Sequence, residues 1–505
     1  MSGIFINSDA WNFWFGAPIE KMNAQGIRED VDYYAGKGGV EAVFYNMNFQ
    51  RSFYPTKVGT PFWKDLSLDE NGKLLMRGKP VTAENSESDY RAMFLRSKKM
   101  NEEFPGFMAY RYKYCHEKGI EMWHSMRMDD VHHTPLKLEH RPQHCDMWLD
   151  RKDLIRAWYR HTWRGEWVDN ALDYGQPEVY DYHLRMAREY LLDYESDGIE
   201  LDWLRCAPIF KPGFDEMNTP LLTRFMRDVR KAADEAEAKW GHRIRIAARV
   251  PAHVTDAMGM GMDVPTWARE GLIDVLIPSP RDCATEQDTN VALWRILAPA
   301  PVILAPCIDC IMSSNPGWSL EYSAATDCGF ASNFYQQGAD TIYFYNHFPN
   351  QAPSHPDLQS VFGFIGDRKL TAAKPRRHVV TKHMQNGEGK FPVHCYPIEI
   401  WSHCCNGGVK VNAGEDTAGR KATVVIGGKY PFDITILVNT VPCTPLPADT
   451  PLPGNMPGKD GHFVQAEIPA GVLHDGWNDV EIFNNATVTI KDTDIVWMEI
   501  SLSGK

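Results

Sequence analysis

The chain has 505 residues, of which 43% are hydrophobic and 24% charged, a balance that excludes disordered, collagen-like and coiled-coil proteins. Its formal net charge is −13, so we expect no nucleic-acid partner, because non-specific binding to nucleic acid needs a basic surface. The length exceeds that of one domain of about 150 residues, so we expect a large domain with a smaller one, or two to three domains.

The 11 cysteines are scattered and odd in number, which is typical of reduced thiols in an intracellular protein rather than of a disulfide framework. The opening residues, MSGIFINSDAW, have neither the basic region nor the apolar run of a signal peptide. The sequence as it stands therefore predicts a cytoplasmic protein, or a periplasmic or secreted one if a signal has been removed. No run approaches about 18 apolar residues without charge, so we expect no membrane contact.

Residues 1–375 alternate short apolar runs with helical patterns, and this alternation predicts a (β/α)8 TIM barrel. Helical periodicity is clearest over 177–194, where Pro177 suits the first turn and Glu178 suits its positive end. A doubly wound open sheet is the alternative, but no Gly-x-Gly-x-x-Gly follows the first strand. The expected strands are 3–7, 41–46, 120–126, 198–202, 245–250, 273–277, 302–305 and 341–345, and the other clear helices are 221–238, 323–337 and 358–366.

Two long inserts interrupt this alternation, at about 51–105 and about 131–175. Each follows a strand and precedes a helix, so we expect both on the carboxyl-terminal face of the barrel. Inserts of this length in a compact domain are usually functional or disordered. The second insert is rich in tryptophan, which argues against disorder.

Strands dominate from 376 to 505, and we expect a β-sandwich of the jelly-roll kind there, packed on the barrel. Its tryptophans, Trp401, Trp477 and Trp497, suit either a sugar-binding module or a structural brace, and we favour the brace. The proline-rich piece 442–457 is expected to be an irregular loop. The predicted strands are 396–402, 408–412, 422–426, 434–439, 462–468, 478–483 and 495–502.

Two acids stand close together near the end of the fourth predicted strand. Because side chains alternate along a strand, Glu200 and Asp202 share one face, while the neighbouring isoleucine and leucine share the other. The apolar pair should face the helices, so the two carboxylates point into the barrel mouth. Such a pair is expected where one acid must hold a proton and the other must stay ionised. Salt bridges to arginines such as Arg249 or Arg127 are the alternative.

The run Leu172-Asp-Tyr-Gly-Gln-Pro-Glu-Val179, a helix, then Asp197-Gly-Ile-Glu-Leu-Asp-Trp203 and Arg205 resembles a signature of bacterial glycoside-hydrolase-like TIM-barrel proteins. That signature reads L-D-x-x-x-P-E-V, then D-G-I-x-L-D-[YFW]-x-R at the fourth strand. The resemblance covers about residues 115–210, and beyond them only the order of elements. It implies hydrolysis of a glycosidic bond with Asp202 as a catalytic candidate. Glu200 falls at a variable position of the signature.

The ends of the other strands supply further candidates. A hydrolase with two carboxylates needs a partner for the fourth-strand acid, and Asp282, which follows the sixth strand, is our first choice, ahead of Asp309 and Glu286. The catalytic candidates are therefore Asp202, Glu200 and Asp282. Indole rings stack on sugars and amides pair with hydroxyl groups, so polar and aromatic side chains at strand ends suit a carbohydrate. The substrate-binding candidates are Asn46, Asn48, Trp11, Trp123, Arg127, Trp203, Arg205, Arg249, Asp309 and His347.

Arginines are frequent at the expected strand ends, and we expect some of them to bind an anionic substituent such as a uronate or sulfate. Salt bridges to the barrel acids are again the alternative. The arginines concerned are Arg51, Arg127, Arg205, Arg249 and Arg281. His124, His132 and His133 lack metal-ligand spacing, so we expect no metal and no cofactor.

The sequence therefore predicts a glycoside hydrolase that acts on an oligosaccharide or polysaccharide, with the carbohydrate substrate as its partner. A non-catalytic carbohydrate-binding barrel and a metal-dependent barrel hydrolase or isomerase are the alternatives. The oligomeric state is not determined by the sequence, and a homodimer is compatible with it.

Overall fold

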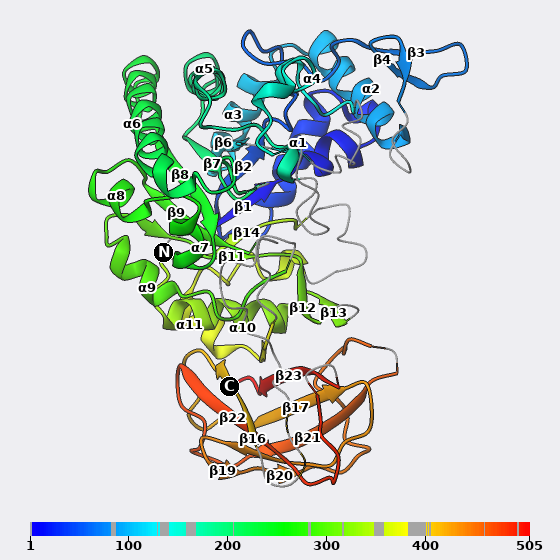
Figure 1. Cartoon of the computed structure of the whole chain (residues 1–505), viewed down its shortest axis with the longest axis vertical. Coiled ribbons are helices and arrows are strands. Elements are labelled where there is room, and N and C mark those ends of the chain that lie inside the picture. Colours follow the sequence, from blue (N-terminus) through cyan, green and yellow to red (C-terminus); the bar gives the residue numbers. More distant parts are fainter. Residues whose placement is uncertain are drawn as a thin grey trace.

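The computed structural model describes residues 3–81, 87–128, 130–131, 141–157, 168–205, 207–280, 284–315, 318–347, 358–381, 400, 402, 406–458, 460–491 and 494–505. A region of alternating strands and helices, blue to yellow-green, lies above a region built of strands, yellow to red (Figure 1). Within these residues, no helix combines the length and hydrophobicity needed to cross a bilayer.

A parallel sheet of nine strands forms the centre of the first region, in the order β10-β9-β8-β7-β6-β2-β1-β14-β11. Each of the eight predicted strands has a counterpart in it. The seventh, predicted over 302–305, is observed as β10, and Ala305 and Pro306 separate it from a further strand, β11, since proline offers no N–H to a sheet. β10 pairs with β9, and β11 pairs with β14. The first and last strands of the order are therefore neighbours in the chain. The strands are β1 (Ile4–Ser8), β2 (Val40–Asn46), β6 (Glu121–Arg127), β7 (Gly198–Asp202), β8 (Arg245–Pro251), β9 (Val275–Ser279), β10 (Ile303–Leu304), β11 (Cys307–Ile308) and β14 (Tyr343–Phe344).

Helices connect these strands and cover the sheet on its outer side (Figure 1). In α5 (Pro177–Asp193), the residues that recur at helical spacing are buried, as the sequence predicts. The helix expected over 358–366 is instead a short 3-10 turn, Leu358–Ser360, and α11 starts later because Asp367 caps the main-chain N–H groups that open it. The remaining connecting helices are α1 (Ala24–Ala35), α3 (Phe107–Glu117), α6 (Asp215–Trp240), α7 (Val254–Gly259), α8 (Val264–Arg269), α9 (Val291–Leu297), α10 (Ala324–Gln336) and α11 (Arg368–Ala373).

The two inserts have structure of their own and contact each other. The first contains a small antiparallel sheet and the helix α2 (Glu87–Glu103), and the second contains α4 (Asp146–Asp150). Lys64 of the first insert pairs with Asp146 of the second at 2.7 Å. The three short strands are β3 (Leu66–Leu68), β4 (Leu74–Met76) and β5 (Lys79–Pro80).

The C-terminal region is built of two antiparallel sheets, ordered β15-β23-β17-β21-β20 and β16-β22-β18-β19. Residues such as Val424 of one sheet and Val480 of the other share one apolar core, so the two sheets pack face to face. Within 442–457, which the sequence predicts to be an irregular loop, Thr444–Pro445 forms a short strand that pairs with β21. Most of the predicted strand 396–402 lies outside the described residues. The strands are β15 (Arg376–Val379), β16 (Asn406–Asn412), β17 (Ala422–Gly428), β18 (Ile434–Val438), β19 (Val441–Pro442), β20 (Thr444–Pro445), β21 (His462–Ile468), β22 (Trp477–Asn484) and β23 (Ile495–Leu502).

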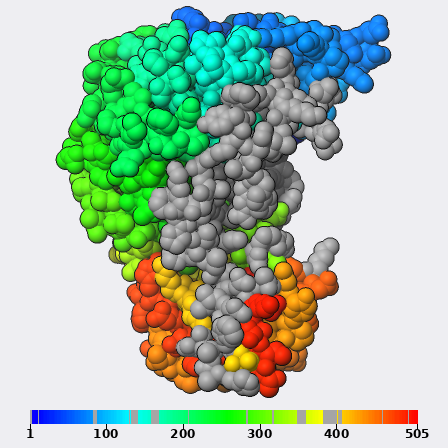
Figure 2. All heavy atoms as spheres, in the orientation of Figure 1, coloured from blue at the N-terminus to red at the C-terminus, as the bar shows by residue number. Residues whose placement is uncertain are grey.

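The all-β region joins the rest of the molecule along α10 and the hairpin of β12 (Ile311–Asn315) and β13 (Trp318–Glu321) (Figure 1). The guanidinium group of Arg376 in β15 donates to Ser332 Oγ of α10 at 2.8 Å. Trp497 of β23 is completely buried in the main apolar core. The C-terminal strands form the lower part of the surface in Figure 2.

Candidate functional site

The inward face of the parallel sheet changes from apolar to charged along its strands. Its apolar part contains Phe5, Phe44 and Trp123, whose rings pack against one another at centroid distances from 4.7 to 6.4 Å. Nearer the carboxyl ends, β7 places Glu200 between Ser125 and an alanine of the neighbouring strands. The last residue of β7, Asp202, lies in register between Arg127 and Arg249.

Glu200 is completely buried and both of its carboxyl oxygens accept hydrogen bonds. Asn7 donates to Oε2 at 3.0 Å, and the hydroxyl group of Tyr343 donates to Oε1 at 2.5 Å. Burial, together with the negative charge of Asp202, raises the pKa of Glu200 to about 7. Glu200 therefore holds a proton to a much higher pH than an exposed glutamate does.

Asp202 forms a buried ion pair with Arg249. The Nη1 atom of Arg249 lies 2.9 Å from one carboxylate oxygen and 3.0 Å from the other, and the main-chain N–H of Arg205 donates to Oδ1 at 3.1 Å. Arg249 is itself fixed, because its Nε donates to Ser279 Oγ at 3.1 Å and its guanidinium group lies 3.8 Å above the ring of Tyr345. The two acids of β7 thus have opposite environments, one surrounded by uncharged hydrogen-bond donors and one paired with a cation.

Arg127 also lies in an ion-pair network at the strand ends. Its guanidinium group pairs with Asp9 and with Asp130, the latter at 2.5 Å. The side-chain amide of Asn48 binds the main chain of Arg127 on both sides, accepting from its N–H at 3.2 Å and donating to its carbonyl at 3.0 Å. This use of the amide argues against the predicted contact of Asn48 with a sugar.

Asp309 supplies another buried carboxyl group directly after β11. Its Oδ1 accepts from the main-chain N–H of Cys310 at 2.7 Å and from Asn346 at 3.2 Å, whereas Oδ2 accepts no hydrogen bond among the described residues. Burial raises the pKa of Asp309. His347, on the next strand connection, is buried and stacks on Tyr322 at 4.5 Å.

Two predicted tryptophan contacts are corrected by the structure. Trp123 lies in the apolar part of the inward face, and its indole N–H donates to Glu121 at 2.8 Å. Trp203 packs outside the sheet, edge-on to Tyr174 and Phe225 at 5.5 Å each. Both indoles are completely buried by side chains, so neither presents a face to a sugar.

Arg51 is also placed differently from the expectation that it binds an anionic substituent. It is completely buried, and its guanidinium group donates to the carbonyl groups of His144 at 2.8 Å, Lys64 at 2.6 Å and Phe62 at 3.4 Å. Through these hydrogen bonds, the guanidinium group of Arg51 connects the two inserts.

The remaining candidates are placed in part. Asn46 is buried at the end of β2, and its Oδ1 accepts no hydrogen bond among the described residues. The main chain of Trp11 opens the short π-helix Trp11–Gly16, but its side chain lies outside the described part of the chain. Asp282 and Arg281 also lie outside it, so both stay predictions.

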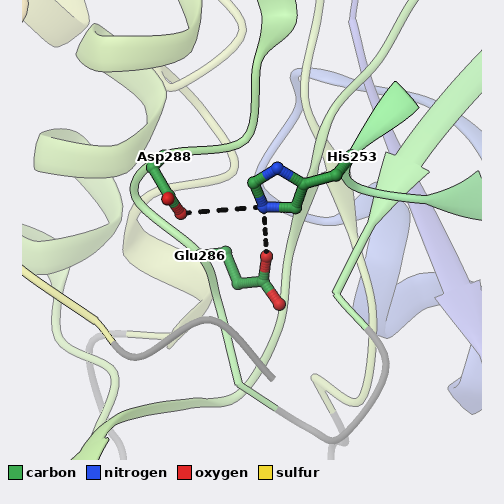
Figure 3. Close-up of side chains that lie close together, drawn as sticks. All are labelled: His253, Glu286 and Asp288. Carbon is green, nitrogen blue, oxygen red and sulfur yellow. Dashed lines mark hydrogen bonds and ion pairs between the residues drawn. The ribbon is translucent and has the colours of Figure 1, made fainter. Parts of the chain in front are cut away.

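One constellation is absent from the sequence predictions. His253 follows β8, and Glu286 and Asp288 follow β9; their side chains meet with one ligand atom from each within 4.8 Å of the others (Figure 3). No local spacing reveals this group, because it joins two connections separated by more than thirty residues. The sequence could have indicated this group through the predicted adjacency of the fifth and sixth parallel strands, because adjacent strands bring the connections that follow them together.

No protein-family model and no curated protein matches the sequence. Among solved structures, the chain is similar to chitinase ChiW from Paenibacillus sp. str. FPU-7, with 11% identity over 99% of this chain and 54% of that chain and a TM-score of 0.41. It is similar to α-L-fucosidase isoenzyme 2 from Paenibacillus thiaminolyticus, with 12% identity over 73% of this chain and 49% of that chain and a TM-score of 0.39. The chain thus spans about half the length of these proteins, and likenesses this weak assign neither a family nor an activity.

Proposed function

We propose that this protein is a glycoside hydrolase acting on an oligosaccharide or polysaccharide, with its chemistry at the carboxyl ends of the parallel strands. In this proposal residues 1–375 form a (β/α)8 barrel and residues 376–505 form a jelly-roll-like sandwich that acts as a brace. The resemblance of the fourth-strand sequence to the glycoside-hydrolase-like signature supports it, because Asp202 of that signature lies on the inward face.

The observation that carries the proposal is the difference between neighbouring buried carboxyl groups. Asp202 is paired with Arg249, whereas burial raises the pKa of both Glu200 and Asp309. Hydrolysis of a glycosidic bond by two carboxyl groups needs one that is protonated and one that is ionised. An acid whose pKa burial raises, together with an acid paired with a cation, is therefore the expected arrangement.

Asp202 is the proposed ionised group, acting as nucleophile or as the base that takes a proton from water. Among the described residues, Asp309 is the favoured proton donor to the leaving oxygen, because its Oδ2 accepts no hydrogen bond from any of them. Asp282 is the alternative. Glu200 lies one layer deeper with both oxygens occupied, so we assign it to positioning, through its hydrogen bonds and its effect on Asp202.

An anionic substituent remains part of the proposal through Arg205 and through Arg281, which stays a prediction. Arg127 and Arg249 are each paired with buried aspartates, so their charges are compensated within the protein. Arg205 is partly exposed and follows Asp202 directly. We propose that a uronate or sulfate group, if the substrate carries one, lies near it.

The test compares Asp202→Asn with the wild type on a panel of 4-nitrophenyl glycosides and polysaccharides, with product measured as nitrophenol or new reducing ends. We expect kcat/KM to fall about 100-fold or more, because loss of a positioned acid or base typically costs that much. Asp274→Asn is the matched control: Asp274 is also paired with an arginine, at 2.5 Å, but it precedes β9 at the opposite end of the sheet.

A folded Asp202→Asn variant with wild-type turnover would remove the proposed catalytic group. Binding of a glycan by the wild type without release of product over long incubation would instead support the non-catalytic carbohydrate-binding barrel. Circular dichroism of both variants distinguishes loss of chemistry from loss of structure.

A further inference from the structure

Two neighbouring strand connections bring an imidazole and two carboxylates together. His253 lies directly before α7, two residues after the end of β8, while Glu286 and Asp288 lie in the connection from β9 to α9. The side chains of Glu286 and Asp288 reach the imidazole ring of His253 from the same connection (Figure 3). One nitrogen and two oxygen donors therefore converge on one point.

The spacing of these donor atoms matches a shared ion. His253 Nε2 lies 3.0 Å from Glu286 Oε2 and 3.8 Å from Asp288 Oδ1. Ligand atoms that each lie about 2.1 Å from a tetrahedral Zn²⁺ are about 3.4 Å apart. The two observed distances bracket that value, and all three ligand atoms lie within 4.8 Å of one another, a spacing that one ion can share.

A second observation points to a ligand at the same place. The side chain of Asp288 is only 8% exposed, and its Oδ1 accepts no hydrogen bond among the described residues although it faces the imidazole ring. A buried carboxylate oxygen without a hydrogen-bond donor is costly, because no protein hydrogen bond replaces the ones that it lost to water. An ion between Asp288 and His253 would satisfy that oxygen.

The backbone that carries the ligands is held in place. Gln287, between the two acids, donates its N–H to Thr381 Oγ1 at 2.9 Å and accepts at its carbonyl from Asn333 at 2.7 Å. The carbonyl group of Ala252, next to His253, accepts from the indole N–H of Trp294 at 2.8 Å. The backbone next to the ligands is thus held in place before a ligand arrives, which is the condition for a tight site.

We propose that His253, Glu286 and Asp288 bind one Zn²⁺ ion, with the remaining coordination position left to water. Imidazole favours Zn²⁺ over Mg²⁺, since Mg²⁺ prefers six oxygen ligands in octahedral geometry. Three protein ligands with one open position is also the arrangement of zinc sites that activate water or polarise a carbonyl group. The site is independent of the proposed glycoside hydrolase activity, and its test uses no substrate.

The test titrates EDTA-treated, dialysed protein with ZnSO4 against a chromophoric chelator. We expect one Zn²⁺ per chain and a rise in Tm with zinc, because an ion that binds only the folded state stabilises it. MgCl2 at the same concentration should compete poorly. Loss of a group that only hydrogen-bonds to a metal ligand typically weakens metal binding by roughly 10- to 100-fold. His253→Gln and Asp288→Asn each remove a ligand itself, so each should weaken Zn²⁺ binding by more than that.

His116→Gln is the matched control, because His116 lies 3.0 Å from a single carboxylate, that of Asp197, and is 44% exposed. It should bind Zn²⁺ as the wild type does. Asp288→Asn is expected to fold, because Oδ1 of Asp288 accepts no hydrogen bond from any residue that the structure describes, and its Tm in EDTA verifies this. Absence of stoichiometric binding by the wild type, or wild-type affinity in folded Asp288→Asn, would overturn the proposal.

Discussion

Two acidic residues of one strand have different electrostatic environments because their neighbours on the adjacent strands differ. Glu200 and Asp202 are two positions apart, yet one accepts hydrogen bonds from uncharged groups and the other faces a guanidinium group. The alternation of side chains along a strand predicts that the two acids share a face. It does not predict which of them receives the arginine, because that depends on the register of β7 against β8.

Glu200 gives a prediction about stability and pH. Its pKa in the folded protein is about 7, above the ordinary value of 4.5, so the folded state holds the proton more tightly than the unfolded state does. The stability that this proton contributes is present at low pH and is lost as the pH rises from 4.5 to about 7. Relative to Glu200→Gln, the wild type should therefore lose up to about 3 kcal/mol of unfolding free energy over that interval.

The measurement is urea unfolding of both proteins at several pH values across this range. Glu216→Gln, at an exposed position in the first turn of α6, is the control and should follow the wild type at every pH. A constant difference between the wild type and Glu200→Gln would contradict the prediction.

At the scale of elements, burial on every side distinguishes α10 from the amphipathic helices. Every residue from Thr326 to Tyr335 is buried, because the helix lies between the parallel sheet and β15. The sequence predicts the helix itself from its periodicity, but its burial on all sides requires the C-terminal region to be in place. The described parts of the inserts show the same dependence, since each contacts the other through Lys64–Asp146 and through Arg51 and the carbonyl group of His144.

Arg51 gives a prediction about the inserts. Arg51→Met keeps the apolar stem and removes the donors to the carbonyl groups of His144, Phe62 and Lys64. Hydrogen bonds from a charged group contribute about 1.5–3 kcal/mol each, so the inserts should open more often. Hydrogen exchange measured by mass spectrometry should rise in peptides that cover these carbonyl groups.

Arg151→Met serves as the control for this change, because Arg151 lies in the second insert but is exposed and pairs with its neighbour Asp153. It should leave exchange unchanged. Unchanged protection in Arg51→Met would show that side-chain packing alone holds the inserts together.

The whole molecule is held together by close contact between α10 and the C-terminal strands. A Cβ atom placed on Gly329 would lie 2.1 Å from the carbonyl oxygen of Arg377 in β15, so only glycine allows this approach. Trp497 of β23 is part of the main apolar core and donates its indole N–H to Glu499 at 3.0 Å. This burial supports the role of a brace for the C-terminal region, because Trp497 is unavailable to a sugar.

Gly329→Ala therefore tests the docking of the two regions. The methyl group should force α10 and β15 apart and cost about 1–3 kcal/mol, the usual range for overpacking. Calorimetry should show a lower Tm for this variant. Gly106→Ala is matched to it, since a Cβ there meets no atom within 4 Å, and it should keep the wild-type Tm. Equal Tm values for both variants would contradict the close contact.

The sequence by itself determined the succession of the central parallel strands along the chain, the all-β character of the C-terminal region, and the shared face of Glu200 and Asp202. These properties follow from local periodicity, which needs no knowledge of distant residues. The sequence also indicated strand-end residues as site candidates. It could not distinguish side chains on the inward face of the sheet from those that pack outside it, as Trp203 shows.

Only the tertiary structure decided the partners. The pairing of Asp202 with Arg249, the use of Asn48 on the main chain of Arg127, and the meeting of His253 with Glu286 all join residues far apart in the chain. Strand neighbours and loop conformations fix these contacts, and burial then sets their electrostatics, because the cost of losing water depends on everything that surrounds a charge.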